Sequence, residues 1–561
     1  MFEQITPFLI FFSAALLVGL LPANLRRWAV IIAPLVGLLN LWSLPAETIS
    51  TWPFLHEQLI PMRVDKLSTL FGILFHIAAL IGGIYSFHLR DRVQQVAGLL
   101  YAGSALGAVF AGDLLTLYIF WELLAISSAF LILARHTDKS KSAALRYLLI
   151  QVGSGLILLA GLVFHYHRTG SLAFNTLSLE EISGALIFLA FGIKACFPGL
   201  HNWLTDAYPE ATPTGAVFLS AFTTKVAVYA FARAFPGAEP LIYIGATMAM
   251  FPIFYAVIEN DLRRVLCYSM INQIGFMLVG IGLGTNLGIN GAVAHAFNDV
   301  IFKGLLFMSM GAVLLRTGRM NGSDLGGLYK SMPLTTGFCM VGAASISAFP
   351  LFSGFVSKSM VMVAALNLNH EMVWLMLLFA SAGVFHHAGI KIPFFAFYAH
   401  DSGIRCKEAP TNMLIAMGLA SFLCIFNGSY PWFLYDLLPM EMNYNPYDIT
   451  HVLTQVQLLF FSALAFVLLK KYNIYPPELV STNIDAEWLY RRMLPGFMRI
   501  IGNSIGRAIT GISSSIGGTT LWIAQTTKPQ RTFLFKHDQT TNSSAILVLL
   551  FLGGYLVMFM Y

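Results

Sequence analysis

Long apolar runs most constrain what this chain can fold into. About sixteen of them are long enough to cross a bilayer as helices, since about 20 predominantly apolar residues span the hydrocarbon core. The composition agrees, because 57% of the 561 residues are apolar and only 11% are charged. The sequence therefore predicts an all-α, polytopic membrane protein.

Basic residues between the runs predict the orientation. With sixteen spans, loops after odd-numbered spans carry most of the lysines and arginines, for example Arg263, Arg264, Lys470 and Lys471. By the positive-inside rule these loops face the cytoplasm, so both termini face the outer, periplasmic side of an inner or plasma membrane. The leader Met1–Thr6 has neither a basic region nor a cleavage site. We therefore expect the first run to be a retained span rather than a removed signal peptide.

Residues 191–225 contain an interrupted apolar helix. Lys194 lies inside it, and Pro198 and Gly199 follow four and five residues later. Because proline has no N–H, Pro198 leaves the carbonyl of Lys194 without its helical partner. In lipid such a break persists only where protein or trapped water satisfies the freed groups. We therefore expect this stretch to line an ion pathway.

A second break follows at the corresponding place further along the chain. Pro350 and Gly354 interrupt another apolar run, and Lys358 comes just beyond. Asp113 precedes Pro198 by 85 residues, and Arg264 precedes Pro350 by 86. Broken helices at matching positions in consecutive five-helix units indicate a duplicated transporter core. Because five is odd, the second repeat is expected to be inverted in the membrane.

Ionisable residues inside the predicted spans are candidate proton sites. Glu122 lies mid-span, where a charge costs roughly 2.5–3.5 kcal/mol on insertion scales and usually has a partner and a task. A buried lysine balanced by a nearby carboxylate can accept and release a proton near neutral pH. The predicted proton relay comprises Glu122, Lys194, Lys225, His295, Asp299, Lys303 and Lys358, with His387 and Lys391 as an altered exit.

Packing alone is the alternative interpretation for some of these groups. Glu122 could pair with a neighbouring helix to fix packing. His295, Asp299 and Lys303 are four residues apart and share one helix face, so the last two could neutralise each other beside a packing histidine. We expect no cofactor, metal site or catalytic residue, because the five cysteines are scattered without a CxxC pair. The formal charge of +6 lies in membrane-flanking loops and predicts no nucleic-acid partner.

The chain is expected to comprise six parts. In order, these are N-terminal scaffold helices at 1–93, a first repeat with a proton half-channel at 94–235, a second, inverted repeat at 241–400, additional helices at 401–471, a cytoplasmic-side amphipathic segment at 472–542 and a terminal anchor at 543–561. Bulky apolar groups alternate with arginines after Asn483, which is typical of a lateral interfacial helix. A disordered basic linker fits 526–542 better.

Several motifs, in order, resemble one family of membrane subunits. They are WELLAISS, GIKACFPGLHNWLTDAYPEATPTGAVFLSAFTTKVAVYA, NDLRRVLCYSMINQIGFM, HAFNDVIFKGLLFM and FPLFSGFVSK. The chain resembles, over about residues 60–440, the antiporter-like subunits of respiratory complex I, membrane-bound hydrogenases and Mrp-type Na+/H+ antiporters. TTKVAVYA most resembles the antiporter D-type subunits. The tail from Asn483 is similar to the lateral helix of complex I's largest subunit, but is much shorter.

The resemblance implies proton movement and assigns roles to the buried charges. Glu122 and Lys194 would form the charge pair of the first half-channel, and Lys225 would link onward. Lys303 would join the two halves, and Lys358 would be the outward gate. Two departures stand out: Asp299 occupies a position where relatives often carry a second histidine, and neither His387 nor Lys391 is a standard family residue.

The leading hypothesis is therefore a component of a multisubunit ion-translocating complex, with Na+/H+ antiport as the expected exchange. Its partners would be other membrane subunits of the same complex, the lipid bilayer, protons and Na+. One alternative is the membrane component of an inorganic-carbon uptake complex beside a soluble zinc protein. Another is a complex I or hydrogenase-type pump component, with electron transfer in partner subunits. An inert scaffold is disfavoured by the retained charges.

Overall fold

The computed structural model describes residues 5–54, 57–479, 483–493 and 495–497. The chain divides into two compact units, residues 1–486 and 487–561. In the second unit the described element is a π-helix, η7 (Leu489–Met493), in which Arg491 pairs with Glu487. The predicted lateral segment beyond residue 497 and the terminal anchor at 543–561 lie outside the described residues.

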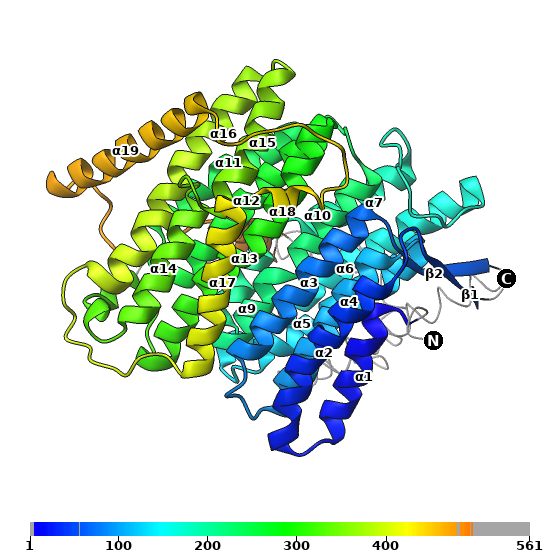
Figure 1. The fold of residues 1–561 in the computed structure, drawn as a ribbon, viewed down its shortest axis with the longest axis horizontal. Helices are drawn as coiled ribbons and strands as arrows, with labels where there is room; N and C mark the ends of the chain where they lie inside the picture. The colour runs from blue at the N-terminus through cyan, green and yellow to red at the C-terminus, as the bar shows by residue number, and fades with distance from the viewer. Residues whose placement is uncertain (1–4, 55–56, 480–482, 494, 498–561) are drawn as a thin grey trace, which may run out of the picture. The chain divides into compact units, whose positions relative to one another are not determined.

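Helices make up almost all of the first unit (Figure 1). Its first half contains α1 (Pro7–Leu20), α2 (Ala23–Ser43), α3 (Lys66–Tyr85), α4 (Arg92–Phe110), α5 (Leu114–Leu133), α6 (Asp138–Thr169), α7 (Ile182–Lys194), α8 (Asn202–Ala207), η2 (Tyr208–Glu210), α9 (Pro213–Ala221) and α10 (Thr223–Ala234). Its second half contains α11 (Pro240–Ile258), α12 (Leu262–Leu283), α13 (Asn286–Thr317), η3 (Gly322–Asp324), η4 (Leu328–Lys330), α14 (Pro333–Ile346), α15 (Ser353–Asn367), α16 (Glu371–Val384), η5 (Phe385–Lys391), η6 (Phe394–Tyr398), α17 (Thr411–Ser429), α18 (Trp432–Tyr435) and α19 (Ile449–Lys471).

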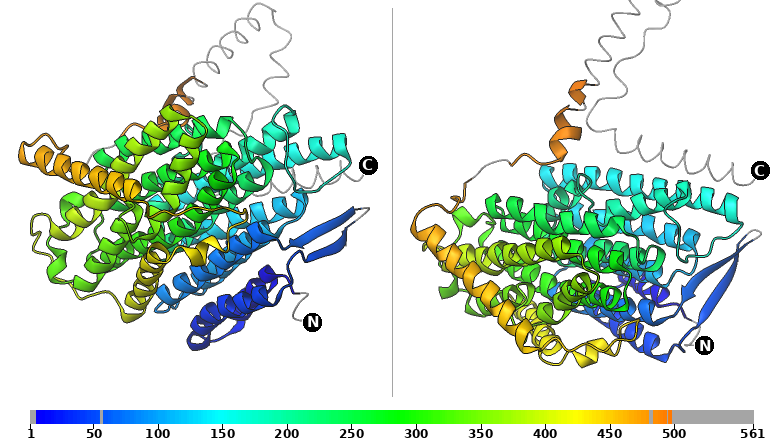
Figure 2. Two further views of the ribbon diagram at one scale, coloured as in Figure 1. Left: turned by 45° about the horizontal axis from the view of Figure 1, so that its top comes forward. Right: turned by 90° about the horizontal axis from the view of Figure 1, so that it is seen from above.

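Length and apolar composition confirm a multi-pass membrane protein. In the described part of the chain, 12 helical stretches are long and apolar enough to cross a membrane, and α1, α7 and α14 are shorter apolar helices. Helix α13 is central, packing against α12, α15, α9, α14 and α17 (Figure 1). Only 11% of the residues in the apolar stretch of α19 are buried, and the helix runs along the outside of the bundle (Figure 2). The total of sixteen spans stays a prediction.

A β-hairpin corrects the all-α expectation. Strands β1 (Ile49–Phe54) and β2 (Glu57–Arg63) pair antiparallel in the loop between α2 and α3. Their β-branched and aromatic residues, such as Thr51, Trp52 and Phe54, fit a pleated surface. The search for apolar runs gave no sign of this hairpin, because its strands are too short and too polar to span a membrane.

The two predicted helix breaks share one backbone pattern. Helix α7 ends at Lys194 and α14 at Ile346, and two left-handed residues three positions apart follow each. Cys196 and Gly199 have φ of 68° and 83° in the first break, while Ala348 and Leu351 have 58° and 72° in the second. Left-handed backbone costs about 1–2 kcal/mol for a residue with a Cβ, so surrounding structure must hold both breaks open.

The helices before the breaks also correspond. Helices α6 and α13 both have 32 residues, and both end at a left-handed glycine, Gly170 or Gly318. Helices α5 and α12 both begin at an aspartate cap, Asp113 or Asp261. Each of these aspartates also forms an isolated antiparallel bridge to the segment after the 32-residue helix.

Contacts between loops fall into two groups. One group, which we call the even-loop side, comprises residues 57–65, 111–113 and 170–181 and is joined by bonds such as Ile60 N to Asp113 Oδ2 (2.6 Å) and Phe174 N to Gly112 O (2.9 Å). The other, the odd-loop side, follows odd-numbered spans. Its loops are residues 208–212, 259–261, 318–332 and 399–410. Arg263 joins the first two of these by donating to the carbonyl of Ala211. This grouping agrees with helices that cross alternately.

Candidate functional site

The first predicted charge pair lies between α5 and α7. Lys194 is fully buried and donates from Nζ to the carbonyl of Trp121 at 2.7 Å. Its ammonium also lies 4.5 Å from the centre of the Trp121 ring. Glu122 acts on Lys194 electrostatically, but its buried Oε1 has no hydrogen-bond partner among the described residues. Trp121 therefore holds Lys194, and the carboxylate stands next to it.

Lys225 in α10 and Asp299 in α13 form a buried ion pair. Lys225 Nζ lies 2.6 Å from Asp299 Oδ2, and both side chains are 0% exposed. Removing two charges from water costs several kcal/mol per ion, so each charge depends on the other. The pair joins the first half of the bundle to the second.

Lys303 and His295 continue the polar chain along α13. Lys303 donates to Ser269 Oγ of α12 at 2.7 Å. His295 is held at both ring nitrogens, with Nδ1 3.0 Å from Ser357 Oγ and Nε2 3.0 Å from Gln273 Oε1. The stripe on α13 was predicted, but each of its members has its partner on another helix.

Lys358 lies five residues into α15, beyond the second break. Its Nζ donates to the carbonyl of Ile346, the last residue of α14, at 2.7 Å, and lies 5.2 Å from the centre of the Phe276 ring. A cation at the C-terminal end of a helix is stabilised by the helix dipole. The break therefore creates the binding place of this lysine.

His387 and Lys391 lie in the π-helix η5, a geometry frequent at functional sites. Lys391 Nζ donates to the carbonyls of Val257 and Glu259, both at 2.6 Å, and lies 3.0 Å from Glu478 Oε1. His387 is fully buried, and the backbone of Gly383, four residues earlier, is its neighbouring polar group. The charge of Lys303 acts on the imidazole.

The predicted break residues lie where the chain turns. Pro198 and Pro350 lie in the turns that follow α7 and α14, and Gly199 takes a left-handed φ of 83°. Gly354, the second residue of α15, lies so close to the Ser345 carbonyl that a Cβ would collide with it. These positions explain the residue types at both breaks.

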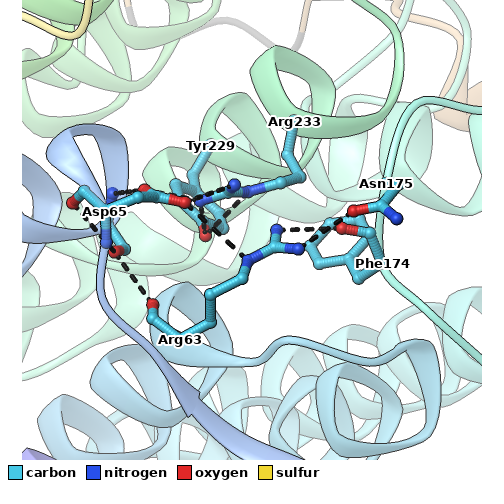
Figure 3. Close-up of polar contacts among 7 residues, drawn as sticks. Arg63, Asp65, Phe174, Asn175, Tyr229 and Arg233 are labelled. Carbon is cyan, nitrogen blue, oxygen red and sulfur yellow. Dashed lines mark hydrogen bonds and ion pairs between the residues drawn. The ribbon is translucent and has the colours of Figure 1, made fainter. Parts of the chain in front are cut away.

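A charged cluster on the even-loop side was not predicted (Figure 3). Arg233 in α10 donates to both carboxylate oxygens of Asp65, at 2.6 and 2.9 Å, and to the hydroxyl of Tyr229. Arg63 donates to the carbonyl of Phe174 and to Asn175. Burial would raise the pKa of Asp65, but the hydrogen bond and charge of Arg233 lower it below its usual value.

The spacing on α10 links this cluster to the buried ion pair. Lys225, Tyr229 and Arg233 are four residues apart and share one helix face. In the sequence, this four-residue spacing is the feature that could have predicted the shared helix face. Because Arg233 lies at the end of its apolar run, it resembled the many basic residues that flank spans and did not stand out.

The chemistry of these groups suits proton transfer. Acids, bases and an imidazole are buried on α5, α7, α10, α13 and α15, where hydroxyl and amide groups hold several of them. In the described residues no group of three or more His, Cys, Asp or Glu is arranged to hold a metal ion.

Fold and buried charges together define a multi-pass membrane protein with ionisable side chains buried among its helices. The sequence profile described as NADH:quinone oxidoreductase/Mrp antiporter, transmembrane region, matches residues 111–385. The D-type Na(+)/H(+) antiporter subunit of Alkalihalophilus pseudofirmus is 32% identical over 361 residues, covering 59% of this chain and 73% of the relative. The chain belongs to this antiporter-like family, which confirms the resemblance inferred from the motifs.

A longer relative and a solved structure extend the comparison. The A-type Na(+)/H(+) antiporter subunit of the same organism is 29% identical over 493 residues, covering 76% of this chain. The chain spans only 60% of that relative's length. The Mrp complex from Dietzia sp. DQ12-45-1b superposes with a TM-score of 0.76 at 23% identity, covering 91% of this chain and 61% of that chain. This likeness confirms an Mrp-like fold.

Proposed function

We propose that this chain is a membrane component of a multisubunit ion-translocating complex and conducts protons along its buried charges. The ion pair between Lys225 and Asp299 carries the proposal. It is wholly buried, at 2.6 Å, and connects helices from the two halves of the bundle. A charge pair in that place is costly, and intramembrane ionisable groups mark ion pathways.

The proposed path begins in the first half and ends beyond the second break. Glu122 and Lys194 exchange a proton beside Trp121, and Lys225 passes it to Asp299. Lys303 and His295 take it along α13, and Lys358 releases it at the end of α14. His387 and Lys391 form a branch from Lys303. Because three contacts hold the Lys391 ammonium, we infer that this residue has a structural role within that branch.

Inverted duplication of the core is part of the proposal. The matched left-handed residues, the equal lengths of α6 and α13 and the paired aspartate caps support it. The repeats are assigned to residues 94–235 and 241–400, after scaffold helices at 1–93 and before additional helices at 401–471. Both termini are assigned to the outer side of the inner or plasma membrane.

The partners are assigned as other membrane subunits, and the exchanged ion as Na+. The names of the relatives support both, because the two proteins of Alkalihalophilus pseudofirmus are named as Na(+)/H(+) antiporter subunits. A respiratory or hydrogenase-type pump is the second candidate, which the NADH:quinone oxidoreductase part of the family description favours. Inorganic-carbon uptake is the third candidate.

Proton transport in everted vesicles tests the proposal. Glu122→Gln, Lys194→Ala and Lys303→Ala should each abolish ΔpH-coupled transport by the assembled complex, while the protein stays in the membrane. Lys139→Ala, which changes an exposed lysine, is the matched control and should keep the wild-type rate. A wild-type rate in any one of these buried variants would overturn the relay. A rate that rises with added Na+ would select antiport among the candidates.

A further inference from the structure

His201 occupies the first helix break and has one fixed and one unoccupied ring nitrogen. It follows Lys194 by seven residues and precedes α8, and it is 2% exposed. Its Nε2 lies 3.3 Å from Asp485 Oδ2 and 3.2 Å from Oδ1. Its Nδ1 is buried and has no hydrogen-bond partner among the described residues. One side of the imidazole is therefore anchored, and the other can exchange a proton.

Asp485 comes from a segment far along the chain. We call residues 472–486 the C-terminal strap, of which 472–479 and 483–486 are described. Asp485 is 8% exposed, and its Oδ2 accepts the hydroxyl proton of Tyr268 at 2.7 Å. Its Oδ1 accepts the backbone N–H of Ala486 at 2.6 Å. Because three donors surround it, the Asp485 carboxylate is an integral part of the site.

The charge of Asp485 is kept at neutral pH. Burial alone would raise the pKa of Asp485, but the hydrogen bond and charge of His201, with the hydroxyl of Tyr268, lower it below its usual value. An ionised carboxylate beside an imidazole stabilises the protonated ring and fixes its orientation. Asp485 thus fixes the His201 ring at Nε2, which leaves Nδ1 as the ring nitrogen without a hydrogen-bond partner among the described residues.

Other groups face this dyad from each neighbouring element. Helix α11 contributes Phe251, whose ring lies 4.8 Å from that of His201, and Tyr255, which stacks on Tyr268 at 5.2 Å. Glu259, in the turn between α11 and α12, pairs with Arg264, in the first turn of α12, at 3.7 Å. Because that carboxylate and guanidinium offset each other, the dyad's own charges dominate.

The His201–Asp485 dyad lies on the odd-loop side. Asn483 of the strap donates to Glu259 Oε2 at 3.3 Å, and Glu259 opens the 259–261 loop that belongs to that side. The dyad therefore lies on the odd-loop side, in the helix break that follows Lys194. The proposed relay has no residue at this entrance.

We propose that His201 takes up the proton on the odd-loop side of the first break, and that Asp485 is the positioning residue that holds its imidazole ready. In this step a proton binds at Nδ1 to give the imidazolium, and the same proton leaves toward Lys194. Nothing else is transferred. The inference rests on the proposed proton function and adds an entrance to it.

The pH profile of transport separates this role from simple attachment of the strap. Asp485→Asn keeps the shape of the side chain but removes the negative charge beside the His201 imidazole. The alkaline limb of the transport profile should then move to lower pH by about 1–2 units, the usual effect of losing an opposite charge. Asp485→Glu should restore most of the shift.

Asn483→Ala is the matched control, because it loosens the strap without touching His201. Its profile should keep the wild-type pH dependence. An unshifted Asp485→Asn profile, or an equal shift in Asn483→Ala, would overturn the inference. Lys303→Ala, measured in the same vesicles, tests the proton function separately. If that variant transports normally the proposed relay fails, whereas loss in that variant with an unshifted Asp485→Asn profile rejects only the entrance.

Discussion

At the scale of single residues, the buried ion pair admits two explanations, transport and packing. A buried salt bridge is weak evidence for stability, because well-packed apolar residues often replace it without loss. Removing one partner is costly, since it leaves an uncompensated charge at a site that is 0% exposed. Lys225 and Asp299 can therefore be tested singly and together.

Asp299→Asn should destabilise the protein by about 3–5 kcal/mol, because Lys225 loses its partner. The double variant Lys225→Met with Asp299→Leu should recover most of that stability and still fail to transport. Thermal unfolding in mild detergent and ΔpH-coupled transport measure the two properties. Recovery of transport in the double variant would show that the pair serves packing alone.

Gly155 offers a way to move Glu122 without changing its charge. A Cβ at Gly155 in α6 would coincide with the Oε1 atom of Glu122. We expect Gly155→Ala to displace the carboxylate from Lys194 and to lower transport by up to roughly a hundredfold, as a misplacement of about 1 Å does to reacting groups. Gly153→Ala on the same helix meets nothing within 4 Å and is the control. Equal rates in the two variants would show that the position of Glu122 is immaterial.

At the scale of elements, the even-loop cluster ties three segments together. Asp65 caps α3 through the N–H of Ser68 and also binds Arg233 of α10, while Arg63 at the end of β2 binds the 174–175 segment (Figure 3). The same carboxylate thus starts one helix and holds another. Its pKa is lowered, so its contribution to stability depends on pH in a defined direction.

Acid should weaken this attachment. A carboxyl with a lowered folded-state pKa stabilises the fold above its unfolded pKa of about 3.9, and that stability is lost as pH falls through the lower folded value. The melting temperature of the wild type should therefore fall more steeply below about pH 5 than that of Asp65→Asn. Asparagine keeps the helix cap, so the difference isolates the charge. If the melting temperatures of the two proteins fell equally with decreasing pH, the role assigned to the Asp65 charge would be contradicted.

At the scale of the whole molecule, the sequence predicted what local chemistry determines. Apolar runs indicate membrane spans and prolines indicate helix breaks, so both breaks and the multi-pass fold were predicted. The partners that these residues contact on other helices were harder to predict. Asp299 and Lys303 share a face, yet Asp299 contacts Lys225 while Lys303 bonds Ser269, because packing of α10 and α12 decides which neighbour is reached. Asp485 meets His201 across 284 residues, and no periodicity predicts that.

Orientation can be tested with the native cysteines. Of the five, Cys196, Cys267, Cys339 and Cys424 are buried, whereas Cys406 is partly exposed. Cys406 lies in the 399–410 loop of the odd-loop side, which is joined to the 318–332 loop by the ion pair of Lys330 and Asp401 at 2.7 Å. If the odd-loop side is cytoplasmic, as the basic residues predict, a membrane-impermeant maleimide should label Cys406 in everted vesicles and not in intact cells. Cys406→Ser should abolish the labelling. Labelling from the outside of intact cells would reverse the orientation, and with it the side on which His201 receives its proton.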